Sequence, residues 1–362
     1  MGYFCSGGCI IAVSPKVCNG CLISIFLLCS LIAAGTGNGR LGVYSTSSTN
    51  LMGTFVESAH VGMVGCLAFM EEHVLVSAGA SGSLKIWDCT RASSCVDEVL
   101  SLETRDDISA INVPRGYGEG SVLLTGSKNG FLHIRDLRTN TGEGDRSTKS
   151  ASGSIVTINT NGSNTIVFGS RMGEVQLHDI RQMRHSIQTF GTNTRNEITS
   201  RDTVSSAVIA EDIWDIAIPK QKGKRRAKQA RFVYTDHSQN PAHVLGVLSV
   251  GFVSPLIVSS ICLEGKIRTF DTITGNRLSD MTLNTTPTDA CHSESAIYIG
   301  DLSGNLQVAR IQRSGEYAIT HFLNKTHQDA ISAVCAMGNS AICSGGVDRN
   351  VFVSKISDQT LY

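Results

Sequence analysis

The chain has 362 residues, of which 41% are hydrophobic, with 36 glycines but only 6 prolines. This composition is too apolar for a disordered chain, and the many glycines are typical of a sheet-rich protein with tight turns. Lysine plus arginine and aspartate plus glutamate both number 31, so no net field draws the chain to nucleic acid or an anionic membrane. The 12 cysteines are too sparse for a small disulfide framework, and we interpret them as buried thiols.

Two short apolar runs open the chain, Gly8–Ser14 and Cys21–Leu28, and both have the length of a β-strand. A competing interpretation takes the uncharged stretch Cys21–Ala34 as the apolar part of a secretion signal. The N-terminus also fits the pattern for acylation at Gly2, with Cys5 as a second acyl site. The sequence leaves these alternatives open.

From Leu31 onward one unit recurs, consisting of an apolar strand, a turn of small residues and a second strand with alternating polarity. Its copies begin at Leu31, Val74, Val122, Thr165, Leu256, Ala296 and Ala341. The last turn residue of each copy is Gly39, Gly82, Gly130, Gly173, Gly265, Gly304 or Arg349. Five of the six intervals between these turn residues are 39 to 48 residues long, near the period of about 40–45 that is typical of propeller blades. The sixth interval is 92 residues long.

Simple packing explains why such units must associate. In the second strand of a copy, Leu84 and Ile86 alternate with Lys85, so the two faces of the strand differ. The first strand is more uniformly apolar, as expected when both of its faces are covered. A glycine at the turn supplies the positive φ that a tight hairpin needs. One such sheet cannot bury both faces alone, but seven stacked in a closed ring can, which predicts an all-β fold with seven blades.

Two motifs recur in step with these strands. The segment SGSLKIWD ends at Trp87 and Asp88, and GFLHIRD, GEVQLHD and GKIRTFD are degenerate forms of it. Upstream, a histidine is followed four, seven and nine positions later by apolar residues, and this occurs at His60, His243 and His327. Both motifs resemble the WD40-repeat family, and the resemblance covers nearly the whole chain.

The resemblance implies a single domain, residues 1–362, folded as a seven-bladed WD40-type β-propeller. Only five residues follow the last predicted strand, which ends at Ser357, and these are too few for an outer strand. We therefore expect Gly8–Ser14 to pair with the last blade and close the ring, as is common in this family. Cys21–Leu28 would then be the innermost strand of the first blade.

In this family a His, a Ser or Thr, an Asp and a Trp of one blade often form a hydrogen-bonded tetrad. No blade of this chain has all four residue types. The turn aspartate is replaced by Ser81, Asn129, Met172, Glu264 and Ser303. Only Asp348 is retained, in a blade that has Ser354 at the tryptophan position. We therefore expect the blades to rely more on apolar packing, and the histidines to be structural and not ligands.

The long interval indicates an insertion between blades four and five, which we place at residues 191–242. In this interpretation His243 begins the inner strand of blade five. Two alternatives remain open, an inner strand at Ile213–Pro219 or a degenerate eighth blade. The insertion contains a run of basic residues without an acid, made of Lys220, Lys222, Lys224, Arg225, Arg226, Lys228 and Arg231. This basic run, residues 220–231, is interpreted as a solvated loop, a nuclear-import signal, or an arm for RNA or an acidic partner.

No catalytic motif stands out. The glycines at positions 37, 39 and 42 match a dinucleotide-binding fingerprint, but a strand follows them where the fingerprint requires a helix. We predict a non-catalytic scaffold for protein–protein interactions, a monomeric propeller within a larger complex, with no cofactor, metal or integral membrane association. The alternative is an RNA-associated propeller that uses the basic run. The expected compartment is the cytoplasm, with the nucleus as the alternative.

Overall fold

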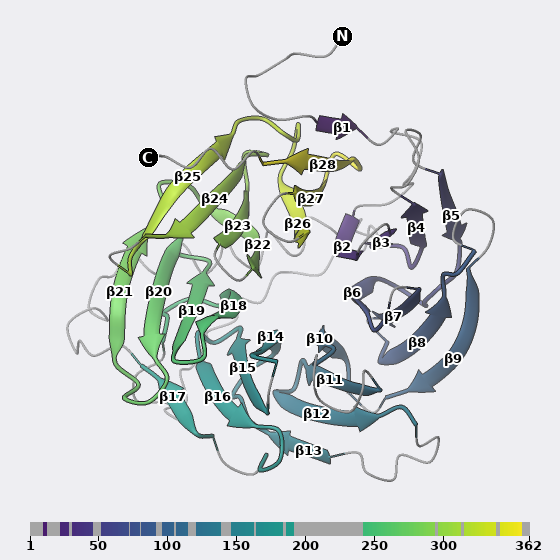
Figure 1. Ribbon diagram of the computed structural model, residues 1–362. Helices are drawn as coiled ribbons and strands as arrows, with labels where there is room; N and C mark the ends of the chain where they lie inside the picture. The colour runs from purple at the N-terminus through teal and green to yellow at the C-terminus, as the bar shows by residue number, and fades with distance from the viewer. Residues whose placement is uncertain are drawn as a thin grey trace, which may run out of the picture.

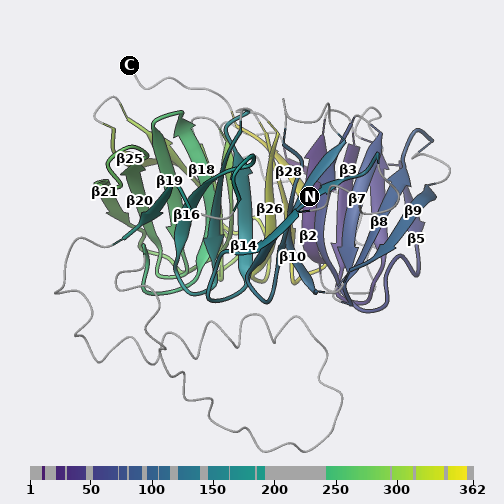
Figure 2. The ribbon, with the colours of Figure 1, turned by 90° about the horizontal axis from the view of Figure 1, so that it is seen from below.

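A computed structural model describes residues 10–12, 22–28, 31–45, 52–71, 73–79, 81–91, 96–104, 106–114, 121–138, 146–162, 164–183, 186–191, 242–293, 296–312, 315–337 and 341–356. These residues form seven four-stranded antiparallel sheets arranged as blades around a central axis (Figure 1). From the side, the strands run along this axis (Figure 2). The predicted all-β, seven-bladed propeller is confirmed.

The first four blades follow one another along the chain. Blade 1 contains β2 (Leu22–Leu28), β3 (Leu31–Thr36), β4 (Leu41–Ser45) and β5 (Met52–Val56). Blade 2 contains β6 (Val64–Phe69), β7 (Val74–Gly79), β8 (Ser83–Asp88) and β9 (Asp97–Glu103). Blade 3 contains β10 (Ile108–Asn112), β11 (Val122–Ser127), β12 (Phe131–Asp136) and β13 (Arg146–Lys149). Blade 4 contains β14 (Ile155–Thr160), β15 (Thr165–Ser170), β16 (Val175–Asp179) and β17 (Gln188–Phe190).

The remaining blades complete the circle. Blade 5 contains β18 (Val247–Ser254), β19 (Ile257–Cys262), β20 (Lys266–Asp271) and β21 (Arg277–Thr282). Blade 6 contains β22 (Pro287–Ser293), β23 (Ala296–Asp301), β24 (Leu306–Ile311) and β25 (Tyr317–Leu323). Blade 7 contains β26 (Ile331–Met337), β27 (Ala341–Gly346) and β28 (Val351–Lys355), with β1 (Ile10–Ala12) antiparallel to β28.

The turn residues behave as the repeat predicts. All seven have a positive φ, from 66° at Arg349 to 84° at Gly39. At Gly173 an added Cβ would collide with the carbonyl oxygen of His243, so glycine is required there by space as well as by φ. Arg349 adopts the same left-handed backbone with a side chain present, at a conformational cost of about 1–2 kcal/mol.

The core lies between the blades, as stacking in a ring requires. Leu84 and Ile86 pack in one cluster with Ile108 and Leu123 of blade 3. On the opposite face of β8, Trp87 packs in a cluster with residues of blade 1. The six described cysteines are free thiols, and four of them are buried.

The inner strand of blade 5 is the one predicted from His243. β18 pairs with β19, with Val250 opposite Ser260, and the described residues form seven sheets. The competing strand Ile213–Pro219 and the basic run lie outside the described residues, as do Gly2 and Cys5. Within the described ranges, no helix has the length and apolar character needed to cross a membrane.

Blade 2 corrects one expectation about the tetrad. The Nε2 atom of His60 bonds Ser77 Oγ at 2.6 Å, and Trp87 Nε1 donates to the same oxygen at 2.8 Å. The Nδ1 atom of His60 bonds Ser83 Oγ at 2.6 Å. Ser83 therefore takes the place of the turn aspartate, which we had assigned to Ser81, and the network is complete without a carboxylate. This network adds to the apolar packing of Trp87, and the assignment of the aspartate position to Ser81 is corrected to Ser83.

In blades 5 and 7 the network is only partial. His327 bonds Asp348 at 2.9 Å and Ser344 at 3.0 Å, but Ser354, at the tryptophan position, has a buried hydroxyl without a hydrogen bond. His243 bonds Ser260 at 2.6 Å through Nε2, while its Nδ1 atom has no hydrogen-bond partner. The position of Gly79 in blade 2 holds Cys262 in blade 5. In blade 2 a Cβ at Gly79 would lie 2.6 Å from His60 Nδ1. The position of Ser83, whose hydroxyl bonds His60 Nδ1, holds Lys266 in blade 5.

The tetrads give a comparative prediction about stability. Ser77→Ala removes the partner of both His60 and Trp87, whereas Ser344→Ala removes a partner of His327 alone. Because each buried polar group left unpaired costs about 1–3 kcal/mol, we expect Ser77→Ala to lower the free energy of unfolding by about 2 kcal/mol more. Urea unfolding followed by tryptophan fluorescence measures the difference. Equal losses in the two variants would contradict the tetrad geometry of blade 2.

Candidate interaction site at the base of the insertion

The two ends of the predicted insertion meet in one apolar cluster between blades 4 and 5. Phe190, at the end of β17, and Ala242, just before β18, are both fully buried in this cluster with Val175 and Val247. The Phe190 ring lies against the Phe270 ring with 5.1 Å between centroids. The chain on either side of the segment 192–241 is therefore fixed in the same core, at Phe190 and at Ala242.

Backbone contacts hold the returning end of the insertion. The His243 N–H donates to the Gly173 carbonyl oxygen at 3.0 Å, which ties the chain to the turn of blade 4. The Leu245 N–H donates to Glu264 Oε1 at 2.8 Å, and Glu264 also lies 3.6 Å from Lys266 Nζ. The chain after Ala242 is therefore held by blade 4 through His243 and by blade 5 through Leu245.

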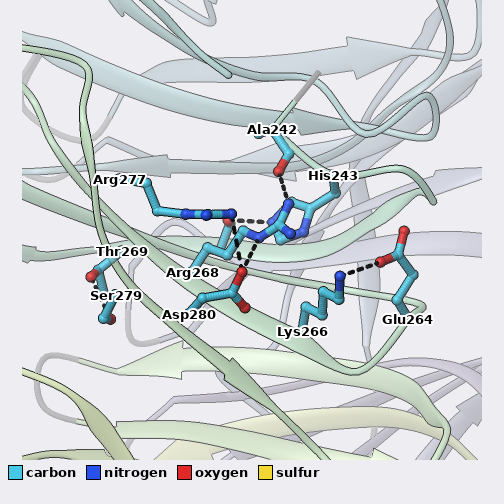
Figure 3. A network of polar contacts seen from close by, with 10 residues as sticks. Ala242, His243, Glu264, Lys266, Arg268, Thr269, Arg277, Ser279 and Asp280 are labelled. Carbon is cyan, nitrogen blue, oxygen red and sulfur yellow. Dashed lines mark hydrogen bonds and ion pairs between the residues drawn. The ribbon is translucent and has the colours of Figure 1, made fainter. Parts of the chain in front are cut away.

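A buried arginine completes this anchor. Arg268 on β20 has no exposed surface, and its Nη1 atom donates to the Ala242 carbonyl oxygen at 2.5 Å (Figure 3). Its Nε atom donates to Asp280 Oδ2 on β21 at 3.0 Å, and Arg277 Nη1 reaches the same oxygen at 3.1 Å. The guanidinium group therefore joins the insertion base to the outer strand of blade 5. A buried charge is tolerated only where such partners surround it.

The cations also act on the neighbouring histidine. Burial lowers the pKa of His243 well below its usual value, and the charges of Arg268 and Lys266 lower it further. His243 is therefore neutral at pH 7.

Sequence reasoning missed Arg268. Its segment, GKIRTFD, was interpreted only as a degenerate signature strand. At the equivalent position of blade 2, Lys85 is partly buried and pairs with Glu98 at 2.7 Å. Arg268 is fully covered instead, and its guanidinium group contacts Ala242 and Asp280. The sequence feature that could have drawn attention to it is an arginine two residues before the aromatic Phe270 of the signature strand.

A second polar cluster joins the inner strands of blades 6 and 7. The Val334 N–H donates to Asp289 Oδ2 at 2.7 Å, and the Thr288 hydroxyl donates to the Ile331 carbonyl oxygen. Burial raises the pKa of Asp289 to about 7, although hydrogen bonds from the backbone of Val334 and Ala290 to the carboxylate lower it in part. A similar link between blades 5 and 6 joins Ser249 to His292 at 2.8 Å.

The carboxyl group of Asp289 predicts a pH dependence. An unfolded aspartate has a pKa of about 4, so between pH 4 and pH 7 the folded chain keeps a proton that the unfolded chain has lost. This contribution to stability therefore falls as the pH rises through that window. Asp289→Asn keeps the acceptor for Val334, and we expect it to raise the free energy of unfolding by about 3 kcal/mol at pH 8 but not at pH 4.

Unfolding curves at several pH values check this prediction. The buried histidines have the opposite effect, since burial lowers the pKa of His60 and His178 to about 4 and removes stability as the pH falls below 6.5. Both wild type and Asp289→Asn contain these histidines, so the difference between their free energies of unfolding does not include the effect of the histidines. An equal difference between the two proteins at pH 4 and pH 8 would show that Asp289 does not titrate as described.

The remaining site predictions fall on residues that the structure does not describe. The basic run from Lys220 to Arg231 lies outside the described residues and stays a prediction. In the described part of the chain, no three or more His, Cys, Asp or Glu side chains are grouped so that they could hold a metal ion.

The comparisons with known proteins agree with the fold. No protein-family model matches the chain. Over 94 residues the chain is 27% identical to the Shk1 kinase-binding protein 15 of Schizosaccharomyces pombe (strain 972 / ATCC 24843). That match spans 26% of this chain and 27% of the yeast protein, so it covers about a quarter of the relative's length.

The crystal structure of the computationally designed Ika8 protein matches over 95% of this chain and 99% of its own, with a TM-score of 0.61 and 15% identity. At that identity the likeness concerns the fold alone. The chain is a seven-bladed β-propeller.

The anchor gives a prediction of its own. Arg268→Leu leaves the Ala242 carbonyl and the Asp280 carboxylate without this partner, and we expect it to lower the free energy of unfolding by about 3 kcal/mol. The matched control is Lys85→Leu, which removes a partly exposed pair worth about 1 kcal/mol or less.

Hydrogen exchange locates the effect of Arg268→Leu. The amides of His243 and Leu245 should lose protection before those of β8 do, because both are held at the insertion base. If the exchange at these two amides were unchanged, the anchor would not depend on Arg268.

Proposed function

We propose that this chain is a non-catalytic scaffold of the WD-repeat type that binds other proteins in a multiprotein complex. The hydrogen-bonded network of His60, Ser77, Ser83 and Trp87 supports the WD-repeat type, because it reproduces the tetrad pattern with a serine in place of the aspartate. The partial likeness to a yeast protein named for binding a kinase supports the class of partner. A protein kinase is accordingly the first partner to test.

The observation that carries this proposal is the anchored base of the insertion. Binding segments of proteins are commonly loops on a rigid scaffold, since a fixed base limits the entropy lost on binding. Here Phe190 and Ala242 fix both ends of a long segment in one core, and Arg268 ties the second end to blade 5. The segment between them contains the seven basic residues of the basic run. This arrangement suits the presentation of a basic segment to a partner.

We also propose that β1 closes the ring. Ile10, Ile11 and Ala12 lie opposite Ser354, Val353 and Phe352 of β28, so the first and last strands of the chain share one sheet. A pairing between the two ends of the chain resists opening of the ring, because the first blade cannot separate from the last without breaking it. We place the closed propeller in the cytoplasm, as a monomer within a larger complex.

A second function has one observation in its favour. The basic run places seven cations in twelve residues without an acid, which suits RNA as well as an acidic protein surface. In this alternative the propeller takes part in RNA maturation, and the nucleus is the expected compartment.

Affinity purification tests the proposal. The full chain is compared with a variant in which residues 192–241 are replaced by a short glycine–serine linker, both after nuclease treatment of the extract. Because the buried ends are kept, the linker variant should fold with an unchanged melting temperature. We expect the full chain to retain a reproducible set of proteins, a kinase among them, and the linker variant to lose at least part of that set.

The outcomes separate the two functions. Partners that disappear with nuclease, and RNA binding that falls steeply with salt with a slope of about −5 for seven phosphate contacts on a single strand, would favour the RNA alternative. A full chain that retains no protein above the background would reject the scaffold.

A further inference from the structure

The outer strand of blade 6, β25, lies at the rim of the ring (Figure 1). In the described part of the chain it pairs with β24 alone, so its other edge has no neighbouring strand. Two of its side chains, Ile319 and Phe322, are 36% and 51% exposed. Its seven residues include no lysine, arginine, aspartate or glutamate. A strand edge of this kind can pair with another chain, because neither charge nor a covering segment opposes it.

The repeat shows that Ile319 is unusual for its position. It lies opposite Ala309, the fifth residue after the turn glycine of blade 6. At the equivalent position the outer strand holds Glu98 in blade 2 and Arg277 in blade 5. These two side chains form ion pairs within their own blades. Blade 6 therefore has an exposed apolar residue where the other long outer strands have a charged one.

Phe322 shows the same replacement. It lies opposite Gln307, the third residue after the turn glycine, and the equivalent outer residues are Ser101 in blade 2 and Asp280 in blade 5. Asp280 forms an ion pair with the residue opposite it, whereas Gln307 donates to the hydroxyl group of Thr285. The polar group of Gln307 is thus already satisfied, and the outer residue of the pair is apolar.

A bulge brings the two apolar side chains to one face of the sheet. The register of β25 shifts at Thr320, so Ile319 and Phe322 lie opposite residues that are two positions apart on β24. Both of those residues face blade 5, because Ala309 packs in a cluster with Ile267 of that blade. Ile319 and Phe322 therefore flank the free edge on the same side.

We propose that the free edge of β25 binds an extended, uncharged segment of a protein partner, which adds a fifth strand to blade 6. A strand edge is matched by the regular series of N–H and C=O groups of a polypeptide backbone, which a lipid does not have. Charge selects within that class of partner. A charged side chain placed against Ile319 or Phe322 would lose water without gaining a counter-charge, whereas an apolar side chain would gain burial.

The proposal rests on the proposed function, and it names one binding surface and one kind of segment for it.

Blade 5 supplies the substitutions that test this edge. Ile319→Arg and Phe322→Asp place on β25 the residue types that β21 holds at the same positions. Both positions are partly exposed, so the two variants should fold with an unchanged melting temperature. The matched control is Val99→Asp, which replaces a 64% exposed apolar side chain on β9, the outer strand of blade 2.

Random twelve-residue peptides displayed on phage and selected on the full chain provide the probe. Selected peptides are synthesised with a fluorescent label, and their binding is measured by fluorescence anisotropy. We expect enrichment of peptides with apolar residues at alternate positions and no charge between them. Ile319→Arg and Phe322→Asp should each weaken binding by about tenfold, because a charge replaces an apolar contact. Val99→Asp should leave the affinity unchanged, and melting curves confirm that all three variants fold.

Backbone methylation separates the addition of a strand from a contact of side chains alone. Alternate residues of an added strand turn their N–H groups toward β25, and the others turn them away. N-methylation of one alternate set of peptide residues should therefore abolish binding, while N-methylation of the other set should leave it largely unchanged.

Several results would overturn the proposal. Enrichment of charged peptides, or of none, would reject the uncharged segment. Equal effects of Phe322→Asp and Val99→Asp would place the peptide elsewhere, and equal effects of the two N-methylated sets would exclude a paired strand. A dimer of the full chain in light scattering that Phe322→Asp dissociates would show that a second copy occupies the edge. In each case the scaffold function stands if affinity purification still retains proteins, so the two proposals fail separately.

Discussion

Each blade of this propeller can bury its two faces only against the blades beside it. Ile86 packs toward blade 3, while Trp87, the next residue along β8, packs toward blade 1. Apolar clusters of this kind recur between blades around the ring, for example between blades 3 and 4 and between blades 6 and 7. Opening the ring at any point would expose two such faces at once, so the stability of every blade depends on closure.

Polar contacts between blades fix the position of one blade against the next. The bond from Val334 N–H to Asp289 fixes the register of blade 7 against blade 6, and the bond of Ser249 to His292 does the same between blades 5 and 6. Apolar surfaces tolerate sliding, whereas a buried hydrogen bond is satisfied at one register only. The residue that fixes this register is Asp289, whose carboxyl group is buried and has a raised pKa.

The repeat made most of the architecture predictable. A fixed spacing of turn residues located the strands, and even Arg349 has the left-handed backbone that its position in the repeat requires. Hydrogen-bond partners of side chains were harder to predict, because the spacing of the turn residues does not say which atoms a given side chain can reach. Ser83 lies on the strand and not in the turn, yet its hydroxyl meets His60.

Arg268 shows a second limit of sequence reasoning. The segment GKIRTFD gives no sign that Arg268 is buried, because its contact is with Ala242, which precedes the inner strand of the blade. Contacts that arise between different repeats do not recur with the repeat, and no periodic signal records them.

The way the insertion is rooted has a consequence for how this protein can change over time. Its two ends are held by Phe190 and by the Ala242–Arg268 contact, both of which are made by residues outside the segment 192–241. Selection on the ring can therefore preserve these contacts while the sequence between them changes.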